Sequence, residues 1–332
     1  MNKKSLKIIA EIGSVHDGSF GNALKLVNAA VEAGANVVKF QTHIPDAETL
    51  ISAPNPGYFN NESRYEYFQR TSFTLDQWMK IAKHCADLNV SFLSSPFSLE
   101  AVNLLESVGV DSYKIPSGEV NNIPLLERVR KTGKPVYLSS GMSNWCELDQ
   151  AVKILNRDEL LTIMQCTSAY PCLPEMVGLN VIPEMKKRYQ TDVGFSDHTL
   201  GFAASIGAVV VGANVIEKHF TFSKLMYGSD AMHSMEPIEF KKFCQEISDV
   251  FKMRETPVDK DDLTPFEEMK KIFEKSIVTS KELKAGTILS LEDLSFKKPG
   301  DGIKASAYKE LIGRIVKFDL PKNHKFIWEN LS

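Results

Sequence analysis

Two histidines stand where two neighbouring apolar runs end. His198 follows the run Asp192–Phe195 and His219 follows the run Asn214–Glu217, so adjacent parallel strands would point both imidazoles at one place. Two neutral imidazoles beside carboxylates suit a divalent first-row metal that keeps open coordination positions. Either histidine alone would be explained as a hydrogen-bonded rim residue, but the pair predicts metal ligands. The nearby carboxylates are those of Asp197, Glu217 and Asp230.

Two lysines end two other runs and have serines around them. Lys39 and Lys114 each follow residues typical of a buried strand, where an ammonium group is costly unless it meets an anion or a carboxylate. Lysine ammonium groups together with serine hydroxyls predict a site for a phosphate or carboxylate group of a substrate. The alternative explanation is a structural ion pair with Glu11 or Glu119.

These residues leave more than one reaction open. A Schiff-base aldolase acting on a keto acid would use Lys39 or Lys114 as its nucleophile and need no metal, which would make the histidine pair superfluous. A metal-dependent barrel hydrolase would use the histidines but leave the lysines and serines unexplained.

The elements that must position these groups alternate along the first two thirds of the chain. Short β-type runs are separated by periodic helical stretches such as Asn22–Ala33 and Leu75–Leu88. Several runs are apolar almost throughout, as in parallel strands that are covered on both faces. Eight such runs predict an α/β fold, a (β/α)₈ TIM barrel, with its chemistry at the carboxyl ends of the strands. The runs are Lys7–Ile12, Asn36–Gln41, Ser91–Ser95, Ser112–Ile115, Pro135–Ser139, Leu161–Cys166, Asp192–Phe195 and Asn214–Glu217.

Polar side chains follow nearly every one of these runs. One polar strand end means little, because strands must emerge into water somewhere, but a ring of them predicts an active site. Besides the lysines and histidines, the ring contains Glu11, Gln41, Ser94, Ser95, Ser117, Glu119, Ser139, Ser140, Gln165, Thr167, Ser168, Ser196, Asp197 and Glu217.

One long interval, Thr42–Thr74, interrupts the alternation. It is polar and rich in aromatic side chains before the next clear helix begins. A long excursion after a barrel strand is commonly an active-site loop or a partner contact, and the sequence leaves both open. Its aromatic residues include Tyr58, Phe59, Tyr65, Tyr67 and Phe68.

The sequence pattern changes toward the end of the chain. Helical stretches are predicted at Pro237–Arg254 and Pro265–Phe273, and short β-type runs follow, one of them at Ile315–Phe318. Such a pattern is typical of a small β-rich domain. We therefore expect a barrel domain over residues 1–254, a linker with a short helix over 255–275 and the β-rich domain over 276–332.

Composition excludes several classes of function. The net charge of -3 and the sequence pI of about 6.2 provide no global basic field that recruits nucleic acid or an anionic membrane. No apolar run approaches the roughly 20 residues that span a bilayer, and the beginning is polar too early for a signal peptide. The five cysteines are scattered and odd in number, so we expect buried thiols in a reducing compartment, the cytoplasm.

Short motifs occur in a fixed order along nearly the whole chain. Together they resemble the sialic acid synthase (N-acetylneuraminate synthase) family, and the closing segment, with Lys284–Thr287 and Lys298–Gly302, resembles the antifreeze-like (SAF) domain of that family. The barrel motifs are Ala10–Gly13 with His16–Gly18, Val38–Thr42, Ser95–Phe97, Tyr113–Glu119, Leu138–Met142, Gln165–Pro171, Ser196–Thr199 and Ile216–Phe220.

The resemblance implies a reaction and a set of residues. It implies condensation of phosphoenolpyruvate with an N-acylmannosamine-type sugar, giving a nine-carbon sialic acid of N-acetylneuraminate or legionaminate type plus phosphate. It also implies Mn²⁺, or Mg²⁺ or Co²⁺, held by His198 and His219. The positions implied for phosphoenolpyruvate are Lys39, Gln41, Ser95, Lys114, Ser117 and Ser139, and those for the sugar are Asp17, Glu119, Ser168, Tyr170, Asp230 and Lys298.

Physical requirements assign roles to four residues. An enol phosphate is a weak nucleophile, so the acceptor aldehyde must be polarised, which a Lewis-acidic metal does. Lys114, with Lys39, neutralises the enol phosphate and fixes it near the carbonyl. Water then captures the positive charge at C2, and the candidates for handling its proton are Glu119 first and Glu217 second.

The resemblance also implies a domain-swapped homodimer in which each SAF domain caps the partner's active site. Some bacterial members of the family have asparagine where this chain has Ser168, and arginine where it has Lys298. A lysine cannot reproduce the two parallel hydrogen bonds that a planar arginine guanidinium donates. The acceptor therefore stays open between N-acetylmannosamine and a 2,4-diacetamido-2,4,6-trideoxymannose. The antifreeze-like segment also suggests a non-catalytic binding module as an alternative function. That alternative would leave the polar strand ends unexplained.

Overall fold

A computed structural model describes residues 5–55, 62–156 and 160–332. The chain forms two compact units, Met1–Thr256 and Pro257–Ser332. In the described residues, no helix is both long and apolar enough to cross a membrane. Of the cysteines, all of them free, four are buried as expected, but Cys146 is exposed. The prediction that all five thiols are buried is therefore wrong at Cys146, which lies on the outer helix α7 (Trp145–Leu155).

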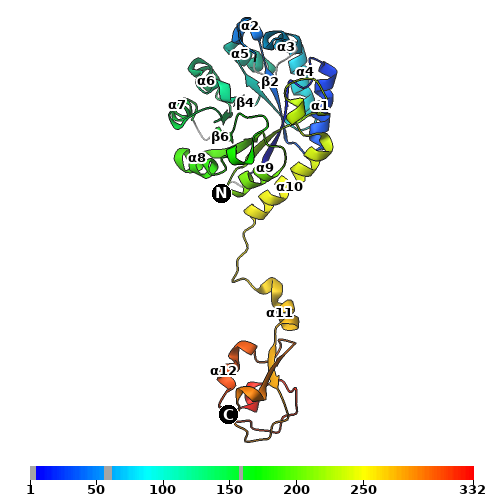
Figure 1. Ribbon diagram of the computed structural model, residues 1–332, viewed down its shortest axis with the longest axis vertical. Helices are drawn as coiled ribbons and strands as arrows, with labels where there is room; N and C mark the ends of the chain where they lie inside the picture. Colours follow the sequence, from blue (N-terminus) through cyan, green and yellow to red (C-terminus); the bar gives the residue numbers. More distant parts are fainter. Residues whose placement is uncertain (1–4, 56–61, 157–159) are drawn as a thin grey trace. The chain divides into compact units, whose positions relative to one another are not determined.

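The first unit is a closed barrel of eight parallel strands, which confirms the predicted (β/α)₈ fold (Figure 1). The barrel closes where β1 pairs with β8, and Glu11 stands level with Lys39 of β2 on one side and with His219 of β8 on the other. The register therefore sets three of the predicted site residues side by side. The strands are β1 (Lys7–Gly13), β2 (Val37–Thr42), β3 (Ser91–Pro96), β4 (Ser112–Ile115), β5 (Val136–Ser139), β6 (Leu161–Cys166), β7 (Asp192–Asp197) and β8 (Val215–His219).

Helices surround the strands (Figure 1). Large side chains fill the inside of the barrel. The interior cluster combines Ile9, Val37, Leu93, Tyr137, Met164 and Val215, so the barrel is packed below the level of the polar residues. The outer helices are α1 (Phe20–Glu32), α4 (Leu75–Asp87), α5 (Leu99–Val108), α6 (Ile123–Arg130), α7, α8 (Val181–Tyr189), α9 (Ala203–Val210) and α10 (Pro237–Glu255).

The described residues of the long interval after β2 form two helices, α2 (Pro45–Glu48) and α3 (Arg64–Thr71). Ser63 and Glu66 form a capping box that fixes the start of α3, where the Ser63 hydroxyl accepts a hydrogen bond from the Glu66 amide. Tyr58 and Phe59, two of the aromatic residues noted above, lie outside the described residues.

The second unit is small and built around an antiparallel pair, β9 (Ser276–Thr279) and β10 (Leu294–Lys297). Helices α11 (Glu267–Phe273) and α12 (Tyr308–Leu311) belong to it as well. The prediction of a β-run at Ile315–Phe318 is wrong: Ile315 and Val316 form isolated bridges only, because the chain there meets single residues of two different segments. Its core consists of Ile277, Leu283, Leu289, Leu294, Ile303, Leu311, Val316, Leu320, Phe326 and Leu331.

Candidate active site

A cavity of about 400 Å³ opens at the carboxyl ends of the barrel strands. Side chains from β1, β2, β4, β5, β6, β7 and β8 reach it, together with residues of the long interval after β2. Its polar lining comprises Glu11, Ser14, Lys39, Gln41, His43, Arg64, Tyr67, Lys114, Ser117, Ser139, Cys166, Ser168, Tyr170, Ser196, His198, Glu217, His219, Ser229, Asp230 and His233.

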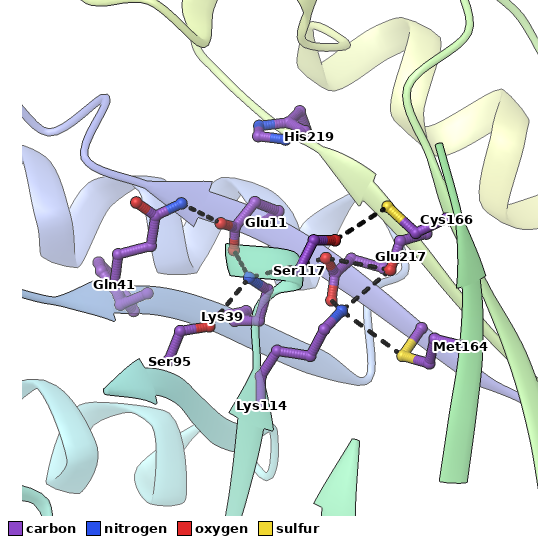
Figure 2. A network of polar contacts seen from close by, with 12 residues as sticks. Glu11, Lys39, Gln41, Ser95, Lys114, Ser117, Met164, Cys166, Glu217 and His219 are labelled. Atoms are coloured by element: carbon purple, nitrogen blue, oxygen red, sulfur yellow. Dashed lines mark hydrogen bonds and ion pairs between the residues drawn. The ribbon is translucent and has the colours of Figure 1, made fainter. Parts of the chain in front are cut away.

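The floor of the cavity holds two buried lysines that share one carboxylate (Figure 2). The Lys114 Nζ lies 2.8 Å from Glu217 Oε2, and the Lys39 Nζ lies 3.6 Å from Glu217 Oε1. Lys39 also pairs with a second carboxylate, that of Glu11, and 2.9 Å separate the Lys39 Nζ from Glu11 Oε2. The ion-pair alternative is thus realised for Lys39 with Glu11, whereas Lys114 pairs with Glu217 and not with Glu119.

Burial and these ion pairs set the charges of the floor. Burial acts to raise the pKa of Glu217, but the ammonium groups of Lys114 and Lys39 outweigh it and lower that pKa to about 2. Burial also disfavours the charge on Lys39, yet Glu11 and Glu217 raise its pKa above the ordinary value. For Lys114 burial dominates, and its pKa is lowered even though Glu217 opposes the shift.

Hydroxyl groups surround the two ammonium groups. Lys114 donates to Ser196 Oγ over 2.9 Å, and Lys39 lies 3.5 Å from Ser95 Oγ. Ser117 and Ser139 line the same cavity from the ends of β4 and β5. Ammonium groups with several hydroxyl donors are suited to a phosphate or carboxylate, because each oxygen of the anion accepts a separate hydrogen bond.

The two histidines face the same cavity from β7 and β8, with 5.6 Å between their ring centroids. The His198 Nδ1 lies 2.8 Å from the carbonyl oxygen of Thr167, so Nδ1 carries the proton and Nε2 keeps its lone pair. That Nε2 lies 3.1 Å from the Tyr170 hydroxyl. Burial, and next His219, lower the His198 pKa to about 4, so the ring is neutral near pH 7.

This pair fits a divalent metal. Among the described side chains, the His219 Nδ1 is one of the few buried polar atoms without a hydrogen-bond partner, and the His198 Nε2 offers a lone pair to the same space. No group of three or more His, Cys, Asp or Glu residues in the described part of the chain is placed to hold a metal. The Asp197 carboxylate binds the Lys218 ammonium group instead, over 3.0 Å. A metal held by the two imidazoles would therefore keep open coordination positions.

Other predicted residues lie at or beyond the rim. The Asp17 carboxylate pairs with Arg70 over 2.6 Å, and Glu119 accepts a hydrogen bond from the Asn122 amide over 2.7 Å. Neither lines the cavity, and Ser95 reaches it only through Lys39. Lys298 belongs to the second unit, where its ammonium group lies 4.7 Å from the centre of the Phe273 ring.

The interval after β2 supplies cavity residues that the sequence did not identify. His43 was not among the predicted site residues, but its ring stacks on those of Phe68 and Phe97, with centroid distances of 3.5 and 4.1 Å. Its Nε2 lies 3.1 Å from Gln41 Oε1, and Gln41 in turn donates to Glu11 over 2.8 Å. Arg64 and His233 also line the cavity and were not predicted. The sequence did contain one signal for His43: it stands two residues after Gln41, which was a predicted site residue.

A model of the NeuB family matches residues 26–259, which is more than half of the chain. The chain belongs to the NeuB family. A model of the SAF domain matches residues 274–325, which confirms the predicted antifreeze-like segment of this NeuB protein.

Relatives of this NeuB protein carry several synthase names. The chain is 37% identical over 334 residues to the N,N'-diacetyllegionaminic acid synthase of Campylobacter jejuni, covering 97% of this chain and 98% of that protein. It is 34% identical over 299 residues to the human N-acetylneuraminate-9-phosphate synthase, with coverages of 87% and 82%. Among solved structures, the N-acetylneuraminic acid synthetase of Leptospira borgpetersenii, in complex with citrate, matches with a TM-score of 0.70 and 28% identity over 80% of this chain and 90% of that one.

Proposed function

We propose that this NeuB protein condenses phosphoenolpyruvate with an N-acylmannosamine-type sugar and releases a nine-carbon sugar acid plus phosphate. The observation that carries the proposal is one cavity in which two buried lysines, sharing Glu217, face a pair of imidazoles. The lysine end suits a small dianionic or trianionic substrate, and the histidine end suits a polarised carbonyl oxygen. The synthase names of the relatives support the same reaction class.

The lysines would hold and orient the enol phosphate. Lys114 and Lys39 already stand on either side of Glu217, so substrate oxygens can replace part of their contact with that carboxylate without moving the ammonium groups far. The serine hydroxyls donate to the remaining oxygens. Fixing C3 of the enol against the aldehyde carbon removes much of the entropic cost of a bimolecular step.

His198 and His219 are the residues that would hold a divalent metal, Mn²⁺ in the first instance. When bound there, the metal supplies Lewis acidity toward the acceptor aldehyde. Tyr170 lines this end of the cavity, with its hydroxyl 3.1 Å from His198 Nε2, and would contact the sugar in this proposal.

The second half of the reaction needs a proton acceptor. A bond forms between C3 of the enol and the aldehyde carbon, and the aldehyde oxygen takes up a proton to become a hydroxyl group. Water then adds at C2 and loses a proton, and phosphate leaves C2 as the keto group forms. Glu119 is the first candidate for taking the proton: it lies outside the cavity lining but follows Ser117 and Gly118, which line it, and burial raises its pKa, which makes the carboxylate a better base. Glu217, held ionised between two lysines, is the second candidate.

Replacing Glu119 by glutamine is expected to lower kcat by roughly 100-fold or more while leaving the affinities for Mn²⁺ and phosphoenolpyruvate within about two-fold. The acidic limb of the kcat profile should follow a group with a pKa above 4.5, since burial raises the Glu119 pKa, and that limb should flatten in the variant. Steady-state kinetics from pH 5 to 9 measure both effects. Near-normal kcat in the variant would remove Glu119 from this role.

One observation favours a second candidate, a Schiff-base aldolase. Burial lowers the pKa of Lys114, and a neutral lysine amine is the form that attacks a carbonyl. Borohydride would then trap a keto-acid substrate on Lys114, and chelators would leave the activity unchanged. The synthase predicts the opposite in both respects.

The reaction is tested by mixing chelator-treated protein with phosphoenolpyruvate, added Mn²⁺ and one sugar at a time. Phosphate release that requires metal and one particular sugar, with a nine-carbon 2-keto acid of the expected mass, would establish the reaction and name the acceptor. N-Acetylmannosamine and 2,4-diacetamido-2,4,6-trideoxymannose are the sugars to compare. Binding of neither phosphoenolpyruvate nor metal would refute the proposal.

The proposal extends to assembly and location. We propose a domain-swapped homodimer in which Lys298 of each chain reaches the partner's cavity, working in the cytoplasm. Light scattering gives the mass of the assembly. A Lys298→Met variant should raise the KM for the sugar and leave the KM for phosphoenolpyruvate unchanged if Lys298 contacts the acceptor.

A further inference from the structure

One cation of the cavity is not used by the reaction described above. Arg64 is the first residue of α3 and lines the cavity, together with Phe68 of the same helix. Its backbone position is fixed, because the Arg64 amide donates to the Asn55 side-chain oxygen over 2.9 Å. The guanidinium carbon lies 5.3 Å from the centre of the Phe68 ring. The side chain is thus held at the cavity by a capped helix end and an aromatic ring.

Arg64 differs from the other cavity cations in having no carboxylate partner among the described residues. Lys39 and Lys114 both pair with buried glutamates, whereas the Arg64 Nε is buried and bonded to no described group. Its positive charge disfavours protonation of two neighbours, His43 and Glu119, and so acts to lower the pKa of each. The guanidinium therefore lies within electrostatic range of the aromatic wall and of the proposed base.

The surroundings of Arg64 suit an uncharged sugar ring that carries a polar substituent. Phe68, His43 and Phe97 form a continuous stack of ring faces along the wall of the cavity. A mostly apolar wall with one well-placed polar group is the usual design of a small-molecule site. A guanidinium presents its donors in a fixed plane and binds carbonyl, carboxylate or phosphate oxygens with defined geometry.

We propose that Arg64 is a specificity-determining residue that donates hydrogen bonds to an oxygen of a substituent on the acceptor sugar. The inference rests on the proposed condensation and assigns Arg64 to the sugar, since the floor lysines already serve the enol phosphate. Two substituents share the required chemistry: the carbonyl oxygen of an N-acyl group and a phosphate ester. The acceptor class is therefore an aldose with an acyl amide or a phosphate directed at α3.

Binding is measured apart from turnover, by calorimetry on the full-length Mn²⁺-loaded protein. The three sugar probes are N-acetylmannosamine, its 6-phosphate and mannose, each titrated without phosphoenolpyruvate, and phosphoenolpyruvate is titrated without sugar. The variants are Arg64→Met, which removes the N–H donors of the guanidinium group, and Arg64→Lys, which keeps the positive charge but loses the planar arrangement of donors. Arg128→Met is the matched control, because the Arg128 guanidinium binds Asn103 on the outer helices.

The expected result is a rise of roughly 10- to 100-fold in the sugar Kd for Arg64→Met, a smaller rise for Arg64→Lys, and no change for Arg128→Met or for phosphoenolpyruvate. If Arg64→Met raises the Kd of both acylated probes but not that of mannose, the acyl carbonyl is the partner of Arg64. If it raises only the Kd of the 6-phosphate, the phosphate group is the partner. An unchanged sugar Kd, an equal loss for phosphoenolpyruvate, or failure of all three probes to bind the wild-type protein would overturn the assignment. Sugar binding that depends on Arg64 without any product formation would instead leave this inference standing and refute the condensation.

Discussion

Replacing His198 or His219 by glutamine is expected to lower metal-dependent kcat/KM by about 1000-fold or more. Each variant removes one of the two imidazoles whose ring centroids lie 5.6 Å apart at this end of the cavity, and no group of three or more His, Cys, Asp or Glu residues in the described part of the chain is placed to hold a metal in their stead. Losing Lewis-acid polarisation of the acceptor forfeits several kcal/mol of transition-state stabilisation, which corresponds to this factor. Phosphate-release kinetics with added Mn²⁺ measure the loss.

Two further measurements make this prediction specific. Electron paramagnetic resonance of free Mn²⁺ should show at least a 10-fold weaker affinity in each variant, while phosphoenolpyruvate affinity stays within a few-fold. His84→Gln is the matched control, because His84 binds the Asn28 side chain between α1 and α4, on the outside of the barrel. Wild-type Mn²⁺ affinity in both histidine variants would show that the metal is held elsewhere or is not needed.

The sequence predicted the barrel because its strands are buried on both faces and leave eight apolar runs. It also predicted that the residues at their ends would meet, since parallel strands bring their carboxyl ends to one rim. His198 and His219 do face one cavity, and Lys39 and Lys114 do lie at its floor. Of the two ion-pair partners that the sequence suggested, Glu11 does pair with Lys39, but Glu119 pairs with neither lysine. The sequence did not identify Glu217 as the carboxylate that both lysines share.

The wall of the cavity could not be predicted in the same way. His43, Arg64 and Phe68 come from an interval without strand or heptad periodicity, so no regular pattern indicates which of its side chains point inward. Their positions depend on the short helix α3 and on the stack of Phe68 against His43. Tertiary packing decides these placements, and residues of such loops are also where relatives of one fold differ in substrate.

Replacing Glu217 by glutamine is expected to have the largest effect on stability of any single change in the cavity. The carboxylate compensates two buried ammonium groups, and an amide would leave Lys114 with no carboxylate within ion-pair distance among the described residues. Removing one partner of a buried ion pair costs about 3–5 kcal/mol, because the remaining charge stays buried without compensation. Urea denaturation at pH 7 gives the free energy of unfolding, and phosphate release should fall in parallel as the lysines lose their positions.

Three comparisons separate this effect from a general loss of charge. Glu239→Gln removes an exposed partner of Lys224, and such pairs contribute at most about 1 kcal/mol. Adding Lys114→Met to Glu217→Gln should restore part of the stability, because no uncompensated ammonium group then remains on β4. The Glu217 pKa of about 2 lies below the ordinary 4.5, so its contribution is fully present above pH 4.5 and declines as the pH falls toward 2. The difference between wild type and Glu217→Gln should shrink over that interval, and a difference independent of pH would contradict the ion-pair explanation.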